Sequence, residues 1–442
     1  MLLKNKNLLL ILLTVLILSG TFLSANFFSN DKKHNTIGYY PLEDISGDGM
    51  REIFLPADHP RFTGTAVTAW NEGYLSGSVL EEERQPRTLN GQTVPNGISV
   101  VKPAAYYSNQ EIIWAKAYSY QFYQGHGEVN QFLPLHDGGF LLFVNCTPFS
   151  ANNRTYDVPD AVLKCNAEGV MTAQKQFSIN GTFAKYAYET SGGDIFILSE
   201  SEGGYGGKDI VLHRLDSNLN IQSEAKLGGS QDEEIANAAF SDNGIVVQGN
   251  TKSENMDFQK KGDFLAGFDN KGKRIWLKMA GEETEELMNH KFLINYNDSF
   301  LIMGYRYLYC YGFDGQLRWK TAFIDNGKVT TDALFLLSDN TICVRYSELS
   351  DVDGYHFLKL DENGKILKRS KDSNGRLVSV KADDQGGFAL QTQRNTEQAR
   401  DGSFNTELVI TKYDAAFKPV YRKTYRDGDV RLLSPTETLI QH

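Results

Sequence analysis

The sequence predicts an all-β fold, namely a seven-bladed β-propeller built from four-stranded antiparallel blades. Three observations predict it. A short turn motif recurs about every fifty residues, a second turn motif alternates with it, and an apolar or alternating run follows almost every turn. A repeat of roughly 40–50 residues is typical of propeller blades, and alternating hydrophobicity is typical of strands at a sheet surface. The 40 glycines and the 12% aromatic residues agree with many short strands and tight turns.

The first turn motif is clearest in "GFDNKGKRIW", which runs from Gly267 to Trp276. It joins the end of one apolar run to the start of the next through an Asp-Asn-Lys-Gly turn. Asp, Asn and Gly are common in such turns because they tolerate positive φ at little steric cost. Related turns are found at Ser108, Asn166, Asp216, Asp269, Asp314, Asp361 and Asp414.

The second turn motif lies between consecutive copies of the first. Its copies are at Asp137, Gly192, Asp242, Asn297, Asp339 and Gln385, with a weaker copy near Pro435. Each is followed by an apolar run, as in "FSDNGIVVQ", which predicts a strand. Seven turns of each type predict seven blades. A four-stranded meander cannot bury both of its faces alone, so the blades are expected to stack on their neighbours.

One unit serves as a template for the strands of a blade. Its strands are predicted near Glu234–Ser241, Gly244–Gln248, Asp263–Phe268 and Lys273–Met279. Tight turns join the first strand to the second and the third to the fourth, whereas longer polar loops make the other connections. This alternation predicts one rim of tight turns and an opposite rim of long, variable loops.

The two ends of the chain predict how the ring closes. Residues 97–442 are assigned to the propeller, and residues 31–96 to an N-terminal extension or cap. The first unit, "ISVVKPAAYYSNQEIIWAKAY", has only the second half of a blade, and the last, "DVRLLSPTETLIQH", has only the first half. We expect the N-terminal and C-terminal strands to pair, because this would cover open strand edges. An open β-solenoid or two sandwiches is the alternative architecture.

The N-terminus carries an export signal. Lys4 and Lys6 precede the apolar run Leu8–Leu18, and a basic start with an apolar core of about 7–15 residues is typical of a signal peptide. Residues 1–30 are therefore expected to form a helical signal peptide or membrane anchor. Cleavage after Ala25 and retention of Leu8–Phe28 as a bilayer span of about 20 residues both remain open. Either outcome predicts an exported protein, extracellular or at the cell surface, that contacts the membrane only through this segment.

The repeats resemble a known family. "GFDNKGKRIW", "YGFDGQLRW" and "KLDENGKIL" resemble the Asp-x-x-Gly-x-x-x-Trp turn of the quinoprotein-like (PQQ-like) repeat propellers, and "KLGGSQDEEIANAAFSDNGIVVQGNT" resembles repeats of large secreted bacterial propellers. The resemblance covers about Gly97–His442. It implies an exported propeller, in a family that contains quinone-dependent dehydrogenases and non-enzymatic scaffolds of envelope assembly. Only Trp276 and Trp319 keep the Trp and no adjacent Cys pair exists, so no quinone or calcium ligand set carries over.

The N-terminal extension contains a candidate calcium loop, "EDISGDGMREIFL". Its oxygen donors alternate along the chain, with a glycine at the bend, as calcium loops require. The donors are Asp44, Ser46, Asp48, the Met50 carbonyl and Glu52. The loop resembles those of integrin-type (FG-GAP) propeller repeats, but Leu55 stands where an EF-hand has an acid. We expect a Gly-rich hairpin turn and no cofactor, with calcium at this loop as the alternative.

Acidic and aromatic residues gather in the long loops. The acids are Asp232, Glu233, Glu234, Glu282, Glu283, Glu285 and Glu286, and the aromatic residues are Tyr118, Tyr120, Phe122, Tyr123 and Tyr205. The two acidic loops belong to consecutive units, so we expect them to be neighbours. They have three interpretations: a solvated charged surface, attraction of a cationic partner, or a carboxylate pair about 5–10 Å apart for glycoside chemistry. The aromatic rings are candidates for stacking on sugars or for covering a blade edge.

Four cysteines lie in separate strand-like runs, at Cys146, Cys165, Cys310 and Cys343. None forms a CxxC pair, which argues against a zinc knuckle. We expect small buried side chains, with disulfides as the alternative outside the cell.

No catalytic motif is present, since the sequence lacks G-x-S-x-G, H-E-x-x-H and a Walker loop. The net charge of −10 argues against nucleic acid, which needs a basic field. We therefore expect a monomeric, non-enzymatic binding or scaffold module that presents its long-loop rim to a protein or a cell-surface glycan. The alternative is a glycan hydrolase or lyase that uses acidic rim residues. A quinone-dependent oxidoreductase is a second alternative.

Overall fold

The computed structural model consists of antiparallel sheets over most of the chain from Phe62 onward. It describes residues 43–44, 62–71, 73–89, 92–107, 112–122, 127–146, 149–151, 154–156, 160–176, 183–202, 206–279, 292–304, 306–324, 329–348, 354–373, 375–398 and 404–426. Every regular element within these ranges is a strand. No helix in the same ranges has the length and apolarity needed to cross a membrane. The all-β prediction is confirmed for this part of the chain.

Seven sheets of four or more strands follow one another along the described residues. The first sheet holds β1 (Glu43–Asp44), β2 (Phe62–Trp70), β3 (Gly73–Leu89), β4 (Gln92–Tyr107), β5 (Ile112–Ala115) and β6 (Tyr118–Phe122). The second holds β7 (Gly127–Pro134), β8 (Phe140–Cys146), β11 (Ala161–Cys165) and β12 (Met171–Gln176). A separate hairpin, β9 (Phe149–Ala151) with β10 (Arg154–Tyr156), lies between β8 and β11 in the chain.

The remaining sheets contain four strands each, paired in chain order. The third holds β13 (Phe183–Glu189), β14 (Ile195–Glu202), β15 (Lys208–Leu215) and β16 (Ile221–Leu227). The fourth holds β17 (Glu233–Ser241), β18 (Gly244–Thr251), β19 (Gly262–Asp269) and β20 (Arg274–Met279). The fifth holds β21 (Leu293–Tyr296), β22 (Ser299–Met303), β23 (Tyr307–Gly312) and β24 (Leu317–Ala322). The sixth holds β25 (Val329–Leu336), β26 (Ile342–Glu348), β27 (Gly354–Leu360) and β28 (Ile366–Ser373), and the seventh holds β29 (Arg376–Ala382), β30 (Phe388–Gln398), β31 (Phe404–Tyr413) and β32 (Pro419–Arg426).

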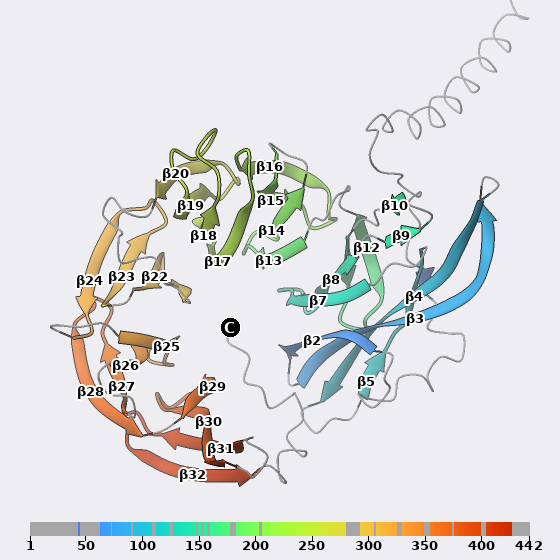
Figure 1. Cartoon of the computed structure of the whole chain (residues 1–442). Coiled ribbons are helices and arrows are strands. Elements are labelled where there is room, and N and C mark those ends of the chain that lie inside the picture. Colours follow the sequence, from blue (N-terminus) through green and yellow to red (C-terminus); the bar gives the residue numbers. More distant parts are fainter. Residues whose placement is uncertain are drawn as a thin grey trace, which may run out of the picture.

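The sheets follow one another around a ring, and in the second to seventh sheets the first strand lies toward the centre and the fourth at the outside (Figure 1). Meanders arranged in this way form a β-propeller. The fourth sheet confirms the template unit, since β17 to β20 coincide with the four predicted strands to within a few residues.

The Asp side chain of the first turn motif accepts hydrogen bonds from backbone N–H groups inside the turn. One carboxylate oxygen of Asp269 accepts the backbone N–H groups of Lys271 at 2.9 Å and Lys273 at 2.8 Å, while Gly272 takes φ 80°. A side chain that satisfies backbone donors in this way favours the turn over an extended strand. The same double acceptor recurs at Asn166, Asp216, Asp361 and Asp414.

One predicted copy of this turn was misaligned by two residues. In the fifth sheet Gly312, rather than Asp314, takes the place of Asp269, because its N–H donates to the carbonyl of Gln316 as that of Asp269 donates to Lys273. Gly315, at φ 79°, then corresponds to the glycine of the fourth-sheet turn.

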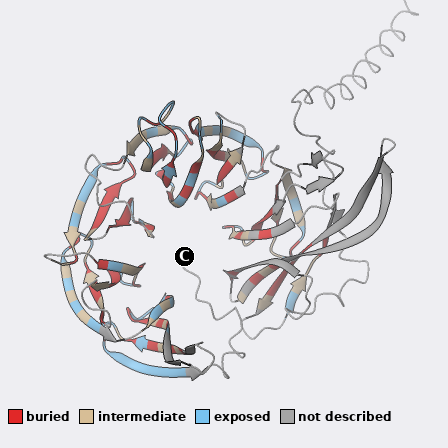
Figure 2. Cartoon of the chain, viewed as in Figure 1, coloured by how far each residue is buried: buried red, intermediate tan, exposed pale blue. Residues whose placement is uncertain are grey.

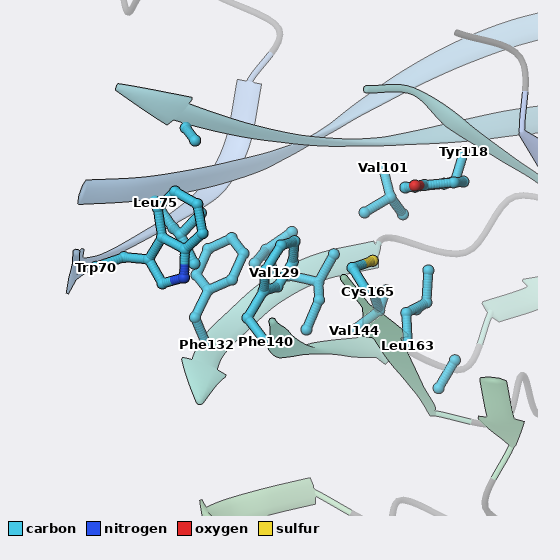
Figure 3. Close-up of a cluster of buried hydrophobic side chains, with 13 residues drawn as sticks. Trp70, Leu75, Val101, Tyr118, Val129, Phe132, Phe140, Val144, Leu163 and Cys165 are labelled. Atoms are coloured by element: carbon cyan, nitrogen blue, oxygen red, sulfur yellow. The ribbon is translucent and has the colours of Figure 1, made fainter. Parts of the chain in front are cut away.

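Apolar side chains between consecutive sheets form the core. Six clusters of buried residues each join one sheet to the next, from the first and second to the sixth and seventh. Buried residues therefore face neighbouring sheets, whereas exposed residues predominate on the outer strands (Figure 2). Figure 3 shows the cluster between the first two sheets, where the Phe132 and Phe140 rings meet edge to face with centroids 5.7 Å apart. Each fully buried side chain of this size contributes roughly 1.5–3 kcal/mol.

A second contact between consecutive sheets repeats around the ring. The indole N–H of Trp276 on β20 donates to the Phe313 carbonyl in the next sheet at 2.8 Å, and its ring lies against Gly315. Trp114 and Trp319 make the equivalent bonds, to the carbonyls of Ala167 at 2.8 Å and Glu362 at 3.0 Å. These three tryptophans thus dock the outer strand of one sheet on the turn of the next.

At four interfaces the size of the docked side chain is complementary to that of the turn residue that receives it. Where a Trp docks, the turn residue at positive φ is a glycine: Gly169, Gly315 or Gly364. Where the docking position is held by Ala173, the receiving turn instead carries Leu219, at φ 65° and buried. Lys368 holds the docking position in the sixth sheet, and the receiving turn of the seventh sheet carries Phe417, at φ 57°. The Lys368 ammonium lies over the Phe417 ring. Large and small residues are thus complementary at the Trp–Gly and Ala–Leu interfaces, as close packing favours. Between the third and fourth sheets the small Ser223 meets Gly272 instead, and its hydroxyl donates to the Lys271 carbonyl at 2.9 Å.

The prediction that a C-terminal strand pairs with the N-terminal strand beginning at residue 97 is wrong. Residues 97–101 of β4 are paired on one edge with β3 and on the other with β6, so this strand has no edge for a C-terminal strand. β3 fills that place because β2, β3, β4 and β5 already form a meander from consecutive residues. The expected boundary between residues 96 and 97 falls inside β4. The stretch "TLIQH" lies outside the described residues, as does the predicted signal segment.

The cysteines that can be assessed are single and buried. Cys165, Cys310 and Cys343 are free thiols in the sheet interfaces. Burial raises the pKa of Cys310 to about 11 and that of Cys343 well above its ordinary value. Both stay protonated at neutral pH, so they pack as small hydrophobic residues, as expected.

Candidate functional site

Two loops of the long-loop rim are well defined next to the fourth sheet. Residues 228–232 connect β16 to β17, and residues 252–261 connect β18 to β19. These are the loops in which the sequence placed the first acidic cluster and a long polar connection. We call the two loops together the fourth-sheet rim.

The two loops are fastened to each other by side chains that bond backbone N–H groups. Asp257 accepts from the Gly228 N–H at 3.1 Å, Asn255 from the Ser230 N–H at 3.0 Å, and Ser253 from the Gln231 N–H at 2.9 Å. Each of these bonds satisfies a donor that a loop would otherwise leave to water. The fourth-sheet rim is therefore pre-organised.

The longer loop is also anchored to the sheet below it. Phe258 is buried and packs against Phe264 with ring centroids 4.9 Å apart. The guanidinium of Arg274 pairs with the Asp257 carboxylate at 2.6 Å. An apolar anchor and an ion pair on adjacent residues hold the loop against the blade.

Glu233 is an internal residue, so its assignment as a binding residue of the rim is corrected. It is fully buried and accepts hydrogen bonds from the Gly229 N–H at 3.0 Å, the Thr251 hydroxyl at 2.6 Å and the Ser253 hydroxyl at 2.7 Å. Desolvation raises the pKa of Glu233, whereas these hydrogen bonds act in the opposite direction. The side chain ties the start of β17 to the end of β18 and offers no oxygen to a partner.

Asp232 and Glu234 flank Glu233 and do face solvent. The Lys252 ammonium lies between them, 3.2 Å from the Asp232 carboxylate and 3.4 Å from that of Glu234. Hydrogen bonds from the Lys208 N–H and from Lys252 lower the pKa of Asp232, and the bond to Asp232 raises the pKa of Lys252. The three side chains form an exposed charge cluster in which one ammonium offsets part of the charge of two carboxylates.

Met256 projects from the middle of the longer loop. Its side chain is 64% exposed and its φ is 57°. Positive φ is uncommon for a residue without special backbone freedom and costs free energy. The bonds made by its neighbours Asn255 and Asp257 hold the chain in this conformation. An apolar tip is thereby presented on a rigid loop.

A polar hollow of about 550 Å³ lies in the fourth-sheet rim. It is lined by Ser230, Gln231, Lys252, Glu254, Asn255 and Lys261. Both lysines and Glu254 are exposed. The hollow offers hydrogen-bond donors and acceptors of both charges, a surface suited to polar recognition rather than to an apolar ligand.

The other predicted site residues lie partly or wholly outside the described residues. Glu282, Glu283, Glu285, Glu286, Tyr123 and Tyr205 are outside them, as are Ser46, Asp48, Met50 and Glu52 of the calcium loop. Asp44 lies in β1 and Tyr120 in β6, as backbone positions only. Tyr118 is buried between the first two sheets, where its hydroxyl accepts from the Met171 N–H at 3.1 Å, so it is not a rim residue. Within the described ranges no group of three or more His, Cys, Asp or Glu side chains is arranged to hold a metal ion.

The sequence did not reveal the residues that organise the fourth-sheet rim. Thr251, Ser253, Asn255 and Asp257 all lie in "GNTKSENMDFQKKG", which the sequence identified only as a long polar loop. Alternation of small polar residues beside a Gly-Gly-Ser segment was the available signal, because such side chains bond nearby backbone groups.

No family model matches the sequence, and no curated protein matches it. Several solved structures are similar to it. The Dos1 propeller is 10% identical, with a TM-score of 0.44 and coverage of 75% of this chain and 89% of that chain. Apo AztD from Citrobacter koseri is 11% identical, with a TM-score of 0.39 and coverage of 73% and 91%. A protein of unknown function from Bacteroides caccae is 12% identical, with a TM-score of 0.31 and coverage of 60% and 90%.

Proposed function

We propose that this chain is an exported, non-enzymatic β-propeller that binds a protein or a cell-surface glycan through its long-loop rim. The proposal takes each of the seven described sheets as one blade of a PQQ-like propeller. The observation that carries it is the pre-organised fourth-sheet rim, where three side-chain-to-backbone bonds hold two loops around a polar hollow.

Rigid loops favour recognition because little conformational entropy is lost on binding. The tight-turn rim repeats the same Asp-capped turn in unit after unit. The long loops differ between units in length and side chains, as expected of surfaces that carry function on a fixed scaffold.

The glycan-enzyme alternative receives no support from the fourth-sheet rim. A glycosidase needs two carboxyl groups that reach the substrate. Glu233 is buried and occupied by three donors, and Asp232 and Glu234 share Lys252. Calcium at Asp44, Ser46, Asp48, Met50 and Glu52 stays a prediction, as does a monomeric state.

The proposal is tested by binding with matched variants on the two rims. Met256→Asp with Lys261→Glu alters the long-loop rim, and Asn218→Asp with Lys271→Glu makes a similar charge change on exposed residues of the tight-turn rim. Ligands are sought among purified cell-surface glycans and envelope proteins. We expect the first variant to lose at least about tenfold in affinity, which is 1.4 kcal/mol, and the second to bind as the wild type does. Equal binding by both variants, or turnover of a glycan by the wild type, contradicts the proposal.

A further inference from the structure

The seventh sheet differs from the others in the exposure of one face. One face of it packs against the sixth sheet through Phe388, Tyr413 and Phe417, which are all buried. The opposite face carries Ala389, Ile410 and Tyr421. Among the described residues nothing packs on this second face in the way that the following sheet packs on each earlier one.

A residue-by-residue comparison with the fourth sheet shows what is uncovered. The turn residues Asp269 and Asp414 are equivalent, so Val246 corresponds to Ala389, Leu265 to Ile410 and Trp276 to Tyr421. Val246 and Leu265 are 0% and 5% exposed because the fifth sheet covers them. Their equivalents in the seventh sheet are partly exposed, and Tyr421 is 52% exposed.

We propose that residues 427–442 of the same chain cover this open face of the seventh sheet as a strand–turn–strand hairpin. Two arguments identify this occupant. The first argument is the order of the sheets along the chain. After each earlier sheet the chain passes directly into the strand that packs on that sheet, so residues 427–442 are expected to do the same after the seventh. β25 follows the fifth sheet in this way, and its Leu334 and Leu336 belong to the buried cluster that contains Leu308 and Cys310 of the fifth sheet.

The second argument is the sequence of the segment. "LLSPTETLI", residues 432–440, is similar to "LLSDNTICV", residues 336–344, which form the end of β25, the turn and the start of β26. In this alignment Val430 and Leu432 take the places of Leu334 and Leu336, which face the preceding sheet. Arg431 takes the place of Phe335, which faces the following one. Sixteen residues are enough for two strands of five residues and a turn.

The inference is independent of the proposed binding function and replaces the closure predicted from the sequence. The C-terminal segment still closes the ring, but it packs on the seventh sheet instead of pairing with β4, whose edges are filled by β3 and β6.

The test measures access to the face directly. An Ile410→Cys variant of the full chain is treated with an alkylating reagent, and labelling at position 410 is followed by peptide mass spectrometry. We expect the labelling rate to rise at least tenfold when the chain ends at Arg426. Leu432→Asp should produce a similar rise, and the matched variant Arg431→Asp should not. Continued protection of the buried Cys310 in the same samples shows that the remaining sheets are folded.

Other occupants give different results. If the first sheet packs directly on the seventh, truncation leaves the rate unchanged, which overturns the proposal. If a second copy of the chain covers the face, labelling depends on protein concentration and light scattering reports a dimer, which also overturns it. Equal effects of Leu432→Asp and Arg431→Asp would refute the proposed orientation of the hairpin.

Discussion

The fourth and seventh sheets have the same design but differ in what lies beside them. Trp276 and Tyr421 occupy the same position on the outer strand, yet the first docks on Phe313 and Gly315 of the next sheet and the second is 52% exposed. The strands themselves do not cause this difference. In a stacked repeat, the burial of a residue is decided by the neighbouring unit, and much of the stability lies in the interfaces.

The largest expected effect comes from removing the docked ring. Trp276→Ala deletes a large side chain from the interface of the fourth and fifth sheets and leaves the Phe313 carbonyl without its donor. We expect the free energy of unfolding in urea to fall by about 3 kcal/mol. Tyr421→Ala, in a chain that ends at Arg426, is the matched control, with an expected change below about 0.5 kcal/mol. Similar losses of unfolding free energy in both variants would show that the neighbouring sheet does not decide how much the outer-strand side chain stabilises the fold.

The same interface allows a rescue experiment. The second and third sheets meet through Ala173 and Leu219, which is the small–large reverse of Trp276 and Gly315. Because volume-conserving changes are tolerated best, Gly315→Leu in the Trp276→Ala background should restore about 1 kcal/mol, despite the cost of positive φ at this position. Alone, Gly315→Leu should destabilise, because a Cβ there would lie 2.9 Å from the indole ring. Additive losses in the double variant would show that the pairing of sizes has no energetic role.

Glu233 and Glu234 give a comparison within the fourth-sheet rim. Glu233→Ala leaves the Gly229 N–H and the hydroxyls of Thr251 and Ser253 without their acceptor. Unpaired buried groups cost about 1–3 kcal/mol, so we expect an unfolding free energy lower by about 2 kcal/mol. Glu234→Ala should change it by less than about 0.5 kcal/mol, as is usual for exposed ion pairs. Circular dichroism during chemical unfolding measures both free energies. A larger loss from Glu234→Ala than from Glu233→Ala would show that Glu233 is not the carboxylate that stabilises the rim.

The buried carboxyl also predicts a pH dependence. Desolvation raises the pKa of Glu233 in the folded state above its ordinary value of 4.5. Its contribution to stability is then fully present below the unfolded pKa and is lost as the pH rises through the folded pKa. Glu233→Gln cannot ionise, so the variant should lose less stability than the wild type as the pH rises above about 4.5. Parallel stability curves for the two proteins would mean that the pKa of Glu233 is not raised on folding.

The fold was more predictable from the sequence than the rim, for a physical reason. The Asp-capped turn is local, since Asp269 bonds residues two and four positions later, so it leaves a regular trace at each repeat. The fourth-sheet rim depends on contacts between loops more than twenty residues apart, such as Asn255 with Ser230. Glu233 looked like its exposed neighbours because only the fold places Thr251 and Ser253 around it. The closure failed because the β2–β3 turn at Asn71, which has the same two-residue form and positive φ as the turn at Asn297, was not counted as a copy of the second motif, and β3 pairs beside β4.

The smallest expected effect distinguishes stability from function at the charge cluster. Lys252→Ala removes the exposed ammonium between Asp232 and Glu234, and exposed pairs contribute about 0–1 kcal/mol, so unfolding should change by less than about 0.5 kcal/mol. The same change leaves two carboxylates beside the polar hollow without their cation. If the rim binds a partner, affinity for it should therefore change severalfold and depend on salt, whereas stability does not. Lys226→Ala is the control, since Lys226 pairs with Glu224 on β16 at 3.4 Å and does not line the hollow. Isothermal titration at two salt concentrations measures the difference in affinity. Equal affinities of the two variants would show that the polar hollow does not take part in binding.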